Sequence, residues 1–311
     1  MKTKHLILIA LLIGVQLSVG AQVTDREADL RKKNAEEFVG WKKGGVTSLN
    51  LAQTSLVNWA AGGQNSVAVN GLLSLFANYK NDNSTWDNSL DVGYGLLRQG
   101  KGTDFMKTDD KFDLLSKYGR QAFKDFYYSG LINFKTQMTE GKSYGADTLK
   151  ISNLLAPAYF LGALGMDYKP NSYFSAFLAP ITGKVTIVND QELSDKGAFG
   201  VEPGKRSKSE LGGYVRMIFS KSDFTREFLK GLTFTTKVDL FSNYLKDPQH
   251  VDVNWETQIA MKVNRYLSVN INTHLLYDYD IKFPVDNGGV IENKSLVQFK
   301  EIFGVGFTYK F

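Results

Sequence analysis

The stretch VQFKEIFGVGFTYKF, from Val297 to Phe311, decides the fold class of this chain. In its second half every second residue is apolar or aromatic, and the residues between them are small or polar. The apolar positions are Phe303, Val305, Phe307, Tyr309 and Phe311. A period of two residues predicts a β-strand with one apolar and one polar face. Such a strand fits the edge of a soluble sheet as well as a sheet that faces lipid, so the other segments have to distinguish the two.

The same alternation runs through the chain beyond Trp41, in about twelve segments. One predicted apolar face comprises Trp86, Leu90, Val92, Tyr94 and Leu96, and another comprises Tyr173, Phe177 and Ile181. The opposite faces carry polar, charged or small residues, such as Asp87, Ser89, Asp91 and Gly93. Segments of about nine to eleven residues with one apolar and one ionic face are typical of transmembrane β-barrels.

The links between these segments separate a barrel from a soluble β-sandwich. The first, third and later odd links are mostly long: Thr54 to Gln64, Gly100 to Asp110, Gly141 to Leu155, Gly183 to Lys208, and Lys282 to Ser295. The even links are mostly short: Asn81 to Ser84, Lys169 to Asn171, and Asn264 to Arg265. Long loops on one side and tight turns on the other are typical of outer-membrane barrels. We therefore predict an all-β, antiparallel, up-and-down transmembrane β-barrel of about twelve strands with both termini periplasmic.

Aromatic residues test this topology independently, because they gather at strand ends beside the short links. They are Tyr79, Trp86, Tyr118, Phe126, Tyr168 and Tyr173. Amphipathic rings at one level of the apolar face are typical of a girdle at the headgroup level of a membrane. We therefore predict a periplasmic aromatic girdle. Glu301 departs from the pattern, since its position in the alternation puts a carboxylate on the lipid face near the outer interface.

The N-terminus predicts export. Lys2 and Lys4 precede an apolar run, and Ser18 to Ala21 supply small residues before Gln22. This order is typical of a secretory signal peptide, and a retained helix is the alternative. The predicted organisation is a cleaved signal peptide at 1–21, a periplasmic segment at 22–43 and a barrel at 44–311.

Composition sets further limits. The chain of 311 residues has no cysteine, so disulfide and thiolate chemistry are excluded. Its formal net charge of +5 is modest and its charges are mixed along the chain, which argues against nucleic-acid binding. The mean hydropathy of −0.23 is compatible with a barrel, because half of each strand faces a polar lumen.

Two further segments carry a family resemblance. The segments GGVTSLNLAQ at 44–53 and NWAAGGQNS at 58–66, together with the Trp86 strand and the terminal strand, resemble an outer-membrane β-barrel family of Bacteroidota-type Gram-negative bacteria that has only a domain-of-unknown-function label. The terminal strand also resembles the C-terminal assembly signal of outer-membrane barrels. The resemblance implies the bacterial outer membrane as location. It implies outer-membrane lipids, lipopolysaccharide and the barrel-assembly machinery as partners, with other outer-membrane or periplasmic subunits possible, and it implies no activity.

The polar faces predict what lines the lumen. The candidate lumen residues are Lys117, Lys135, Arg216, Lys237, Asp239, Glu256, Lys262 and His274. They carry both signs of charge, whereas a selective ion pore favours rings of one sign. Opposite charges can also pair across a narrow interior and fill it. A barrel of about twelve strands lies between small filled barrels and open porins, so a narrow channel and a plugged barrel are both compatible with this lining.

Two functions follow from this lining. The first is a narrow channel for small polar or amphipathic solutes. The second is a non-conducting barrel that serves as scaffold or accessory subunit of an outer-membrane secretion or barrel-assembly complex. A lipase or protease ranks third, because His250 and His274 show no spacing to a serine or acid that would build a catalytic site. We expect no enzyme activity and no cofactor, and no metal site, since calcium-loop spacing is missing.

Overall fold

The computed structural model describes residues 39–57, 63–144, 148–171, 173–262, 267–287, 290–307 and 309–310, and nearly all the regular elements in these residues are β-strands. The long strands are β1 (Gly40–Thr54), β2 (Ser66–Lys80), β3 (Ser84–Gln99), β4 (Met106–Phe123), β5 (Phe126–Thr136), β8 (Ala158–Tyr168), β9 (Phe174–Ile187), β10 (Ser207–Lys221), β11 (Leu232–Asn243), β12 (Val251–Lys262), β13 (Leu267–Tyr277) and β16 (Gln298–Phe307). The short elements are β6 (Gly141–Tyr144), β7 (Thr148–Ser152), β14 (Phe283–Asn287), β15 (Val290–Lys294), β17 (Tyr309–Lys310), the helix α3 (Gln191–Asp195) and the 3₁₀ turns η1 (Ala198–Gly200) and η2 (Glu227–Leu229). The predicted signal peptide and residues 22–38 of the predicted periplasmic segment lie outside the described residues.

One antiparallel sheet of thirteen strands contains all the long strands. Its order is β16-β13-β12-β11-β10-β9-β8-β5-β4-β3-β2-β1-β17, so the long strands pair with their neighbours in the chain. The hairpins β6–β7 and β14–β15 are inserted into two of the links and form separate two-stranded sheets. The predicted all-β, antiparallel arrangement is confirmed.

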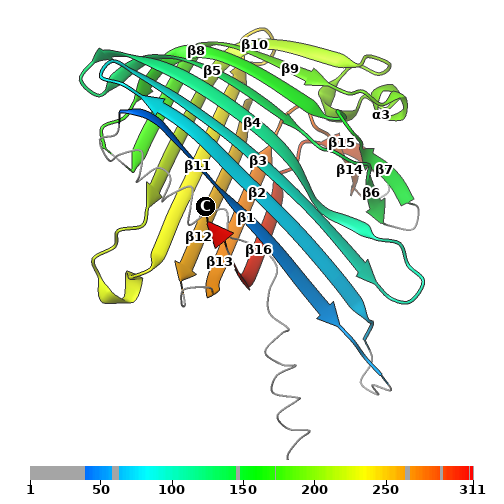
Figure 1. The fold of residues 1–311 in the computed structure, drawn as a ribbon. Coiled ribbons are helices and arrows are strands. Elements are labelled where there is room, and N and C mark those ends of the chain that lie inside the picture. Colours follow the sequence, from blue (N-terminus) through cyan, green and yellow to red (C-terminus); the bar gives the residue numbers. More distant parts are fainter. Residues whose placement is uncertain are drawn as a thin grey trace, which may run out of the picture.

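The two edges of the sheet come together at the last strand segment. β16 pairs with β13 from Leu267↔Phe307 to Leu276↔Gln298, whereas β17 pairs with β1 at Val46↔Lys310 and Thr47↔Tyr309. Figure 1 shows the sheet curling so that β17 lies beside β1. Two residue pairs do not amount to a closed barrel, so barrel closure, the number of about twelve strands and the side of the termini stay predictions.

The two faces of the sheet reverse the usual distribution of side chains in a soluble protein, because large apolar side chains are exposed and small polar side chains are buried. Large apolar side chains on one face are open to the surroundings: Leu114 is 45% exposed, Ile132 54% and Leu164 61%. On the other face, small polar side chains such as Ser74 and Thr235 are buried. Alternation along each strand causes this division, because successive side chains point to opposite faces.

The links follow the predicted alternation, with two corrections to their bounds. β9 runs to Ile187 and so takes in Gly183, with which we had predicted a long link to begin. The link after β3 ends at residue 105, because β4 begins at Met106 and takes in Asp109 and Asp110, which we had predicted to lie in the loop. The next link consists of Lys124 and Asp125, with Lys124 at a φ of 25°. In the short link after β2, the Asn81 side chain accepts hydrogen bonds from the Asn83 and Ser84 backbone and fixes the turn.

A bulge in β9 overturns one predicted face. The register of β9 shifts against both β8 and β10 between Leu178 and Thr182, so β9 carries an extra residue there. Pro180 at the shift has no backbone N–H to give to a ladder. Strict alternation put Phe177 on the lipid face with Ile181, but Phe177 is 1% exposed and faces inward, and its neighbour Leu178 is 52% exposed.

Glycine supplies the space that the bulge needs. Gly165 in β8 lies where the β8–β9 register shifts. A Cβ built on Gly165 would lie 1.9 Å from the Leu178 carbonyl oxygen, so only glycine lets the two strands approach this closely.

The packed core lies on the inner face, on the side of β5 and β8–β11. A cluster of Leu131, Ala163, Phe177, Ala179, Tyr214 and Phe241 is buried there, with Leu115 and Leu161 against it. We had predicted polar or small residues throughout this face. The apolar cluster therefore corrects that prediction, because it fills part of the interior with side chains.

Candidate functional site

Charged side chains from strands far apart in the sheet meet inside its curve. The Lys111 ammonium of β4 lies 3.9 Å from the Glu256 carboxylate of β12. The Lys135 ammonium of β5 lies 4.0 Å from the Asp239 carboxylate of β11. Neighbouring strands are only about 4.8 Å apart, so strands separated by several others can meet only if the sheet curls. The inner face therefore encloses a charged interior.

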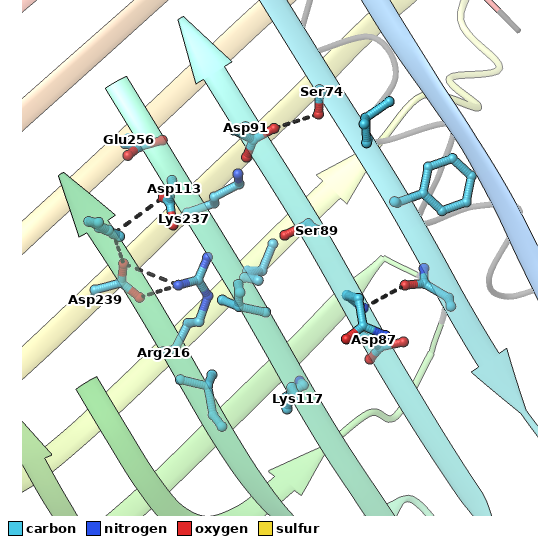
Figure 2. Close-up of a pocket in the computed structure, with 18 of the residues that line it drawn as sticks. Ser74, Asp87, Ser89, Asp91, Asp113, Lys117, Arg216, Lys237, Asp239 and Glu256 are labelled. Atoms are coloured by element: carbon cyan, nitrogen blue, oxygen red, sulfur yellow. Dashed lines mark hydrogen bonds and ion pairs between the residues drawn. The ribbon is translucent and has the colours of Figure 1, made fainter. Parts of the chain in front are cut away.

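These charges line a cavity of about 140 Å³. Figure 2 shows that its walls come from both sides of the curled sheet, with Asp113 and Lys117 of β4 near Arg216 of β10 and Asp239 of β11. The charged lining residues are Asp87, Asp91, Lys111, Asp113, Lys117, Lys135, Arg216, Lys237, Asp239 and Glu256. The volume has room for a few water molecules, so this is a narrow part of the interior.

Asp239 is the most connected acid in the cavity. Its Oδ1 accepts a 2.6 Å hydrogen bond from the Tyr214 hydroxyl and lies 3.3 Å from the Arg216 guanidinium. Its Oδ2 accepts from the Asn254 amide at 3.3 Å and lies 4.0 Å from the Lys135 ammonium. Side chains of β5, β10 and β12 thus converge on this β11 residue.

Asp113 ties the same cavity to β4 and β5. Lys135 lies 3.7 Å and Lys111 3.8 Å from its Oδ2, and the Asn133 amide donates to its Oδ1 at 2.7 Å. The Lys135 ammonium therefore lies within ion-pair distance of both Asp113 and Asp239. A mobile cation or a zwitterion that entered the cavity would meet both signs of charge within a few ångströms.

The interior is filled unevenly. Beside β9 and β10, Phe177 is 1% exposed and the Arg216 side chain 13%. Towards β4 and β16, the Lys111 side chain is 41% exposed and the Lys300 side chain 51%, although Lys300 lies only 3.8 Å from Asp109. The charged side chains towards β4 and β16 are therefore more exposed than those beside β9 and β10, where packed side chains fill the interior.

A second charged cluster lies at the end of the sheet that carries the long links. Lys184 pairs with Asp252 at 2.8 Å and with Glu210 at 3.5 Å. Asp280, in the link after β13, pairs with Lys208 of β10 and with Lys246 in the link after β11. Figure 1 shows α3 and the β6–β7 and β14–β15 hairpins at this same end. The long links are therefore tied to one another and to the strand ends.

The long link between β9 and β10 forms a small core together with the link between β7 and β8. Ala156, Val188, Leu193 and Val201 are buried together. Asp190 caps α3 by accepting from the Leu193 backbone N–H, and it pairs with Lys150 of β7 at 2.8 Å. The hydrogen bond from Lys150 holds the pKa of the Asp190 carboxyl at about 2, below its ordinary value.

Most predicted lumen residues meet in the one cavity. Lys117, Lys135, Arg216, Lys237, Asp239 and Glu256 all line it. His274 lies beside it, 2.7 Å from the Asn254 side-chain oxygen and 3.9 Å from Glu256. The side chain of Lys262 lies outside the described residues. Lys111 was not among the predicted lumen residues. The predicted link ended at Asp110, which put Lys111 at the first position of the following strand, whereas β4 begins at Met106.

The predicted aromatic girdle forms two groups. Tyr79, Trp86 and Tyr118 occupy one cross-strand row of β2, β3 and β4. Trp41, which we had not assigned to the girdle, extends that row, with its ring centroid 5.4 Å from Tyr79. In the second group, Phe126 stacks on Tyr168 at 4.6 Å and Tyr173 meets Phe219 edge-on at 6.2 Å.

The predicted C-terminal assembly signal is described only in its backbone. Phe303, Val305 and Phe307 belong to β16, and Tyr309 belongs to β17. Their side chains and the whole of Phe311 lie outside the described residues, so the signal stays a prediction.

In the described part of the chain, no three or more His, Asp or Glu residues form a group that could hold a metal ion. None of the helices described there has the length and apolar character needed to cross a membrane.

A family described as "protein of unknown function (DUF3078)" matches residues 51–141. No curated protein matches the chain. The fold is similar to an outer membrane channel from Pseudomonas putida F1, at 10% identity and a TM-score of 0.40, over 89% of this chain and 97% of that one. It is also similar to the translocator domain of an autotransporter from Neisseria meningitidis, at 10% identity and a TM-score of 0.40, over 91% and 94%.

Proposed function

We propose that this chain is a bacterial outer-membrane β-barrel that provides a narrow channel for small polar or amphipathic solutes. The inverted faces of the sheet support the membrane location. Its outer face exposes large apolar side chains along the strands, whereas soluble monomers seldom expose apolar patches of more than a few hundred Å². Lipid would remove that face from water, and the short links would lie in the periplasm.

The seam between β1 and β17 supports closure of the barrel. β17 follows β16 after one residue, and its register against β1 brings the two edges of the sheet together. In a membrane an open sheet edge would leave backbone N–H and C=O groups without partners at several kcal/mol each. Closure removes that cost.

The charged cavity is the observation that carries the channel. Lys111 and Glu256 face each other across the interior and are only partly buried, with side chains 41% and 18% exposed. The lining carries five acids and five bases, so the passage would discriminate weakly between cations and anions and would favour small solutes with both charges. In this proposal the residues bind and orient solutes, and none of them acts in catalysis.

Conductance in a planar bilayer tests the channel. The purified full-length chain should give small, steady current steps with weak ion selectivity. Lys111→Gln removes a base of the lining and should shift selectivity towards cations. Lys124→Gln is the matched control, because the Lys124 side chain is 89% exposed in a turn and should leave the current unchanged. A folded, inserted protein that passes no ions would refute the channel.

The second candidate is a non-conducting barrel that serves as scaffold or accessory subunit of an outer-membrane complex. Two observations favour it: ion pairs join opposite walls around a cavity of only about 140 Å³, and the long links are tied together through Asp280. A mild-detergent pull-down from outer membranes tests it. Stoichiometric, salt-resistant partners would support the scaffold, and recovery of the barrel alone would oppose it.

A further inference from the structure

Four cross-strand rows on the outer face of β1–β4 divide that face by chemistry. The first row is aromatic and comprises Trp41, Tyr79, Trp86 and Tyr118. The second is polar or small and comprises Lys43, Ala77, Asn88 and Ser116. The third is apolar or small and comprises Gly45, Leu75, Leu90 and Leu114, and the fourth, Thr47, Leu73, Val92 and Phe112, is mostly apolar. The aromatic row marks the headgroup level of a membrane and the apolar rows mark its acyl chains, so the polar second row lies on the acyl side of the aromatic row.

The polar groups in the second row are satisfied, with one exception. The Trp86 indole donates to the Ser116 hydroxyl at 2.8 Å, and that hydroxyl donates to the Asn88 side-chain oxygen at 2.7 Å. The Asn88 amide donates to the Ala77 carbonyl at 2.9 Å. Among the described residues, no carboxylate lies within ion-pair distance of the Lys43 ammonium.

The Lys43 side chain points towards the aromatic row. Its ammonium lies 5.6 Å from the centroid of the Trp41 ring, and Trp41 itself is 50% exposed. A lysine on a lipid-facing surface extends its stem along apolar atoms and brings its charge to the interface. The charge therefore lies at the level of the girdle, where lipid phosphates lie, and no carboxylate of the described residues pairs with it.

A groove of about 540 Å³ opens next to this ammonium. Lys43 and Asn88 lie at its polar side, and Leu75, Leu90 and Leu114 line it further from the girdle. The small side chain of Ala77 forms part of its floor. The groove thus joins a cation to an apolar trough that crosses β2, β3 and β4.

We infer that this groove is a binding site for an anionic glycerophospholipid of the periplasmic leaflet. The inference rests on the proposed membrane location of the sheet. The lipid phosphate would pair with the Lys43 ammonium beside Trp41, and one acyl chain would lie along Leu75, Leu90 and Leu114. Charge selects the headgroup, and the apolar trough holds the chain.

Native mass spectrometry of the full-length protein in detergent tests the site with phosphatidylglycerol and phosphatidylcholine of equal chain length. The unmodified protein should retain phosphatidylglycerol in preference to phosphatidylcholine. Lys43→Gln should weaken phosphatidylglycerol binding roughly fivefold, since a lysine near an anionic lipid surface contributes about that factor. Ala77→Leu should weaken both lipids equally, because it fills the floor of the groove.

Lys221→Gln is the matched control. The Lys221 ammonium also lies over an aromatic ring, 4.7 Å from the Tyr173 centroid, but Asp223 pairs with it at 3.3 Å. Phosphatidylglycerol binding should therefore not change in this variant. An equal loss in both lysine variants, equal binding of the two lipids, or preferential retention of lipopolysaccharide would each overturn the inference.

A gel-mobility measurement separates this inference from the proposed function. An inserted barrel migrates differently before and after heating. If the protein is not heat-modifiable and does not enter membranes, the membrane proposal itself fails, and with it this site. If the protein is heat-modifiable but Lys43→Gln binds phosphatidylglycerol as the unmodified protein does, only the lipid site fails.

Discussion

Replacing Phe177 with alanine tests the bulge in β9 and the packing of the interior together. Phe177 is 1% exposed, its ring lies 6.3 Å from Tyr214 edge-on, and the Lys117 ammonium lies 5.9 Å from its centroid. Alanine would leave a cavity among these side chains, because the surrounding strands cannot collapse on it. We expect Phe177→Ala to lower the free energy of unfolding by about 3–5 kcal/mol.

Leu178→Ala is the control, because the two residues are neighbours in the chain. Leu178 is 52% exposed on the outer face. Lipid or detergent chains would fill the space that its side chain leaves, so no cavity forms. We expect a loss of about 2 kcal/mol or less, the low end of the cost of replacing leucine with alanine. Phe177→Leu, which keeps most of the volume, should cost less than about 1.5 kcal/mol.

Urea unfolding of the protein in lipid vesicles measures these differences, with tryptophan fluorescence and heat-modifiable migration as independent probes of folding. If Leu178→Ala costs as much as Phe177→Ala or more, Phe177 does not face the interior. Strict alternation through β9 would then hold, and both the bulge and the apolar interior cluster would be refuted.

Three further outcomes are expected. Glu256→Gln removes an acid of the cavity, so the ratio of anion to cation permeability in a planar bilayer should rise. The hydrogen bond from Lys150 lowers the pKa of Asp190 to about 2 from an ordinary value of 3.8, so its stabilising effect is fully present above about pH 4 and is lost as the pH falls through about 2. Pepsin should therefore cleave the link at 188–206 faster as the pH falls in that window, and Asp190→Asn should abolish this dependence. Gly165→Ala should lower the free energy of unfolding by about 1–3 kcal/mol, because its Cβ would lie 1.9 Å from a backbone oxygen; unfolding that matches the unmodified protein would contradict this packing.

The faces of most strands could be predicted from the sequence, because alternation along a strand is a local property. Leu114, Ile132 and Leu164 are exposed as alternation predicts. The same rule failed at Phe177, since a single extra residue reverses the face of everything on one side of it. Pro180 was the one local sign of that bulge, which the register of β9 against both neighbouring strands reveals.

The candidate site was predictable in its chemistry but not in its geometry. Lys135, Asp239 and Glu256 could be assigned to the polar face from the sequence. Their contacts depend on how sharply the sheet curls, which no short segment encodes. The same applies to Lys43, whose position beside Trp41 and a groove follows from the register of β1 against β2.

The sequence by itself determined that this chain forms an antiparallel sheet with one apolar and one charged face, because a period of two residues is written into each segment. Only the tertiary structure decided which charges meet, such as Lys111 and Glu256, and which part of the interior is filled by Phe177 and its neighbours. Register and curvature are properties of many strands together, so they bring residues into contact that the linear pattern leaves far apart.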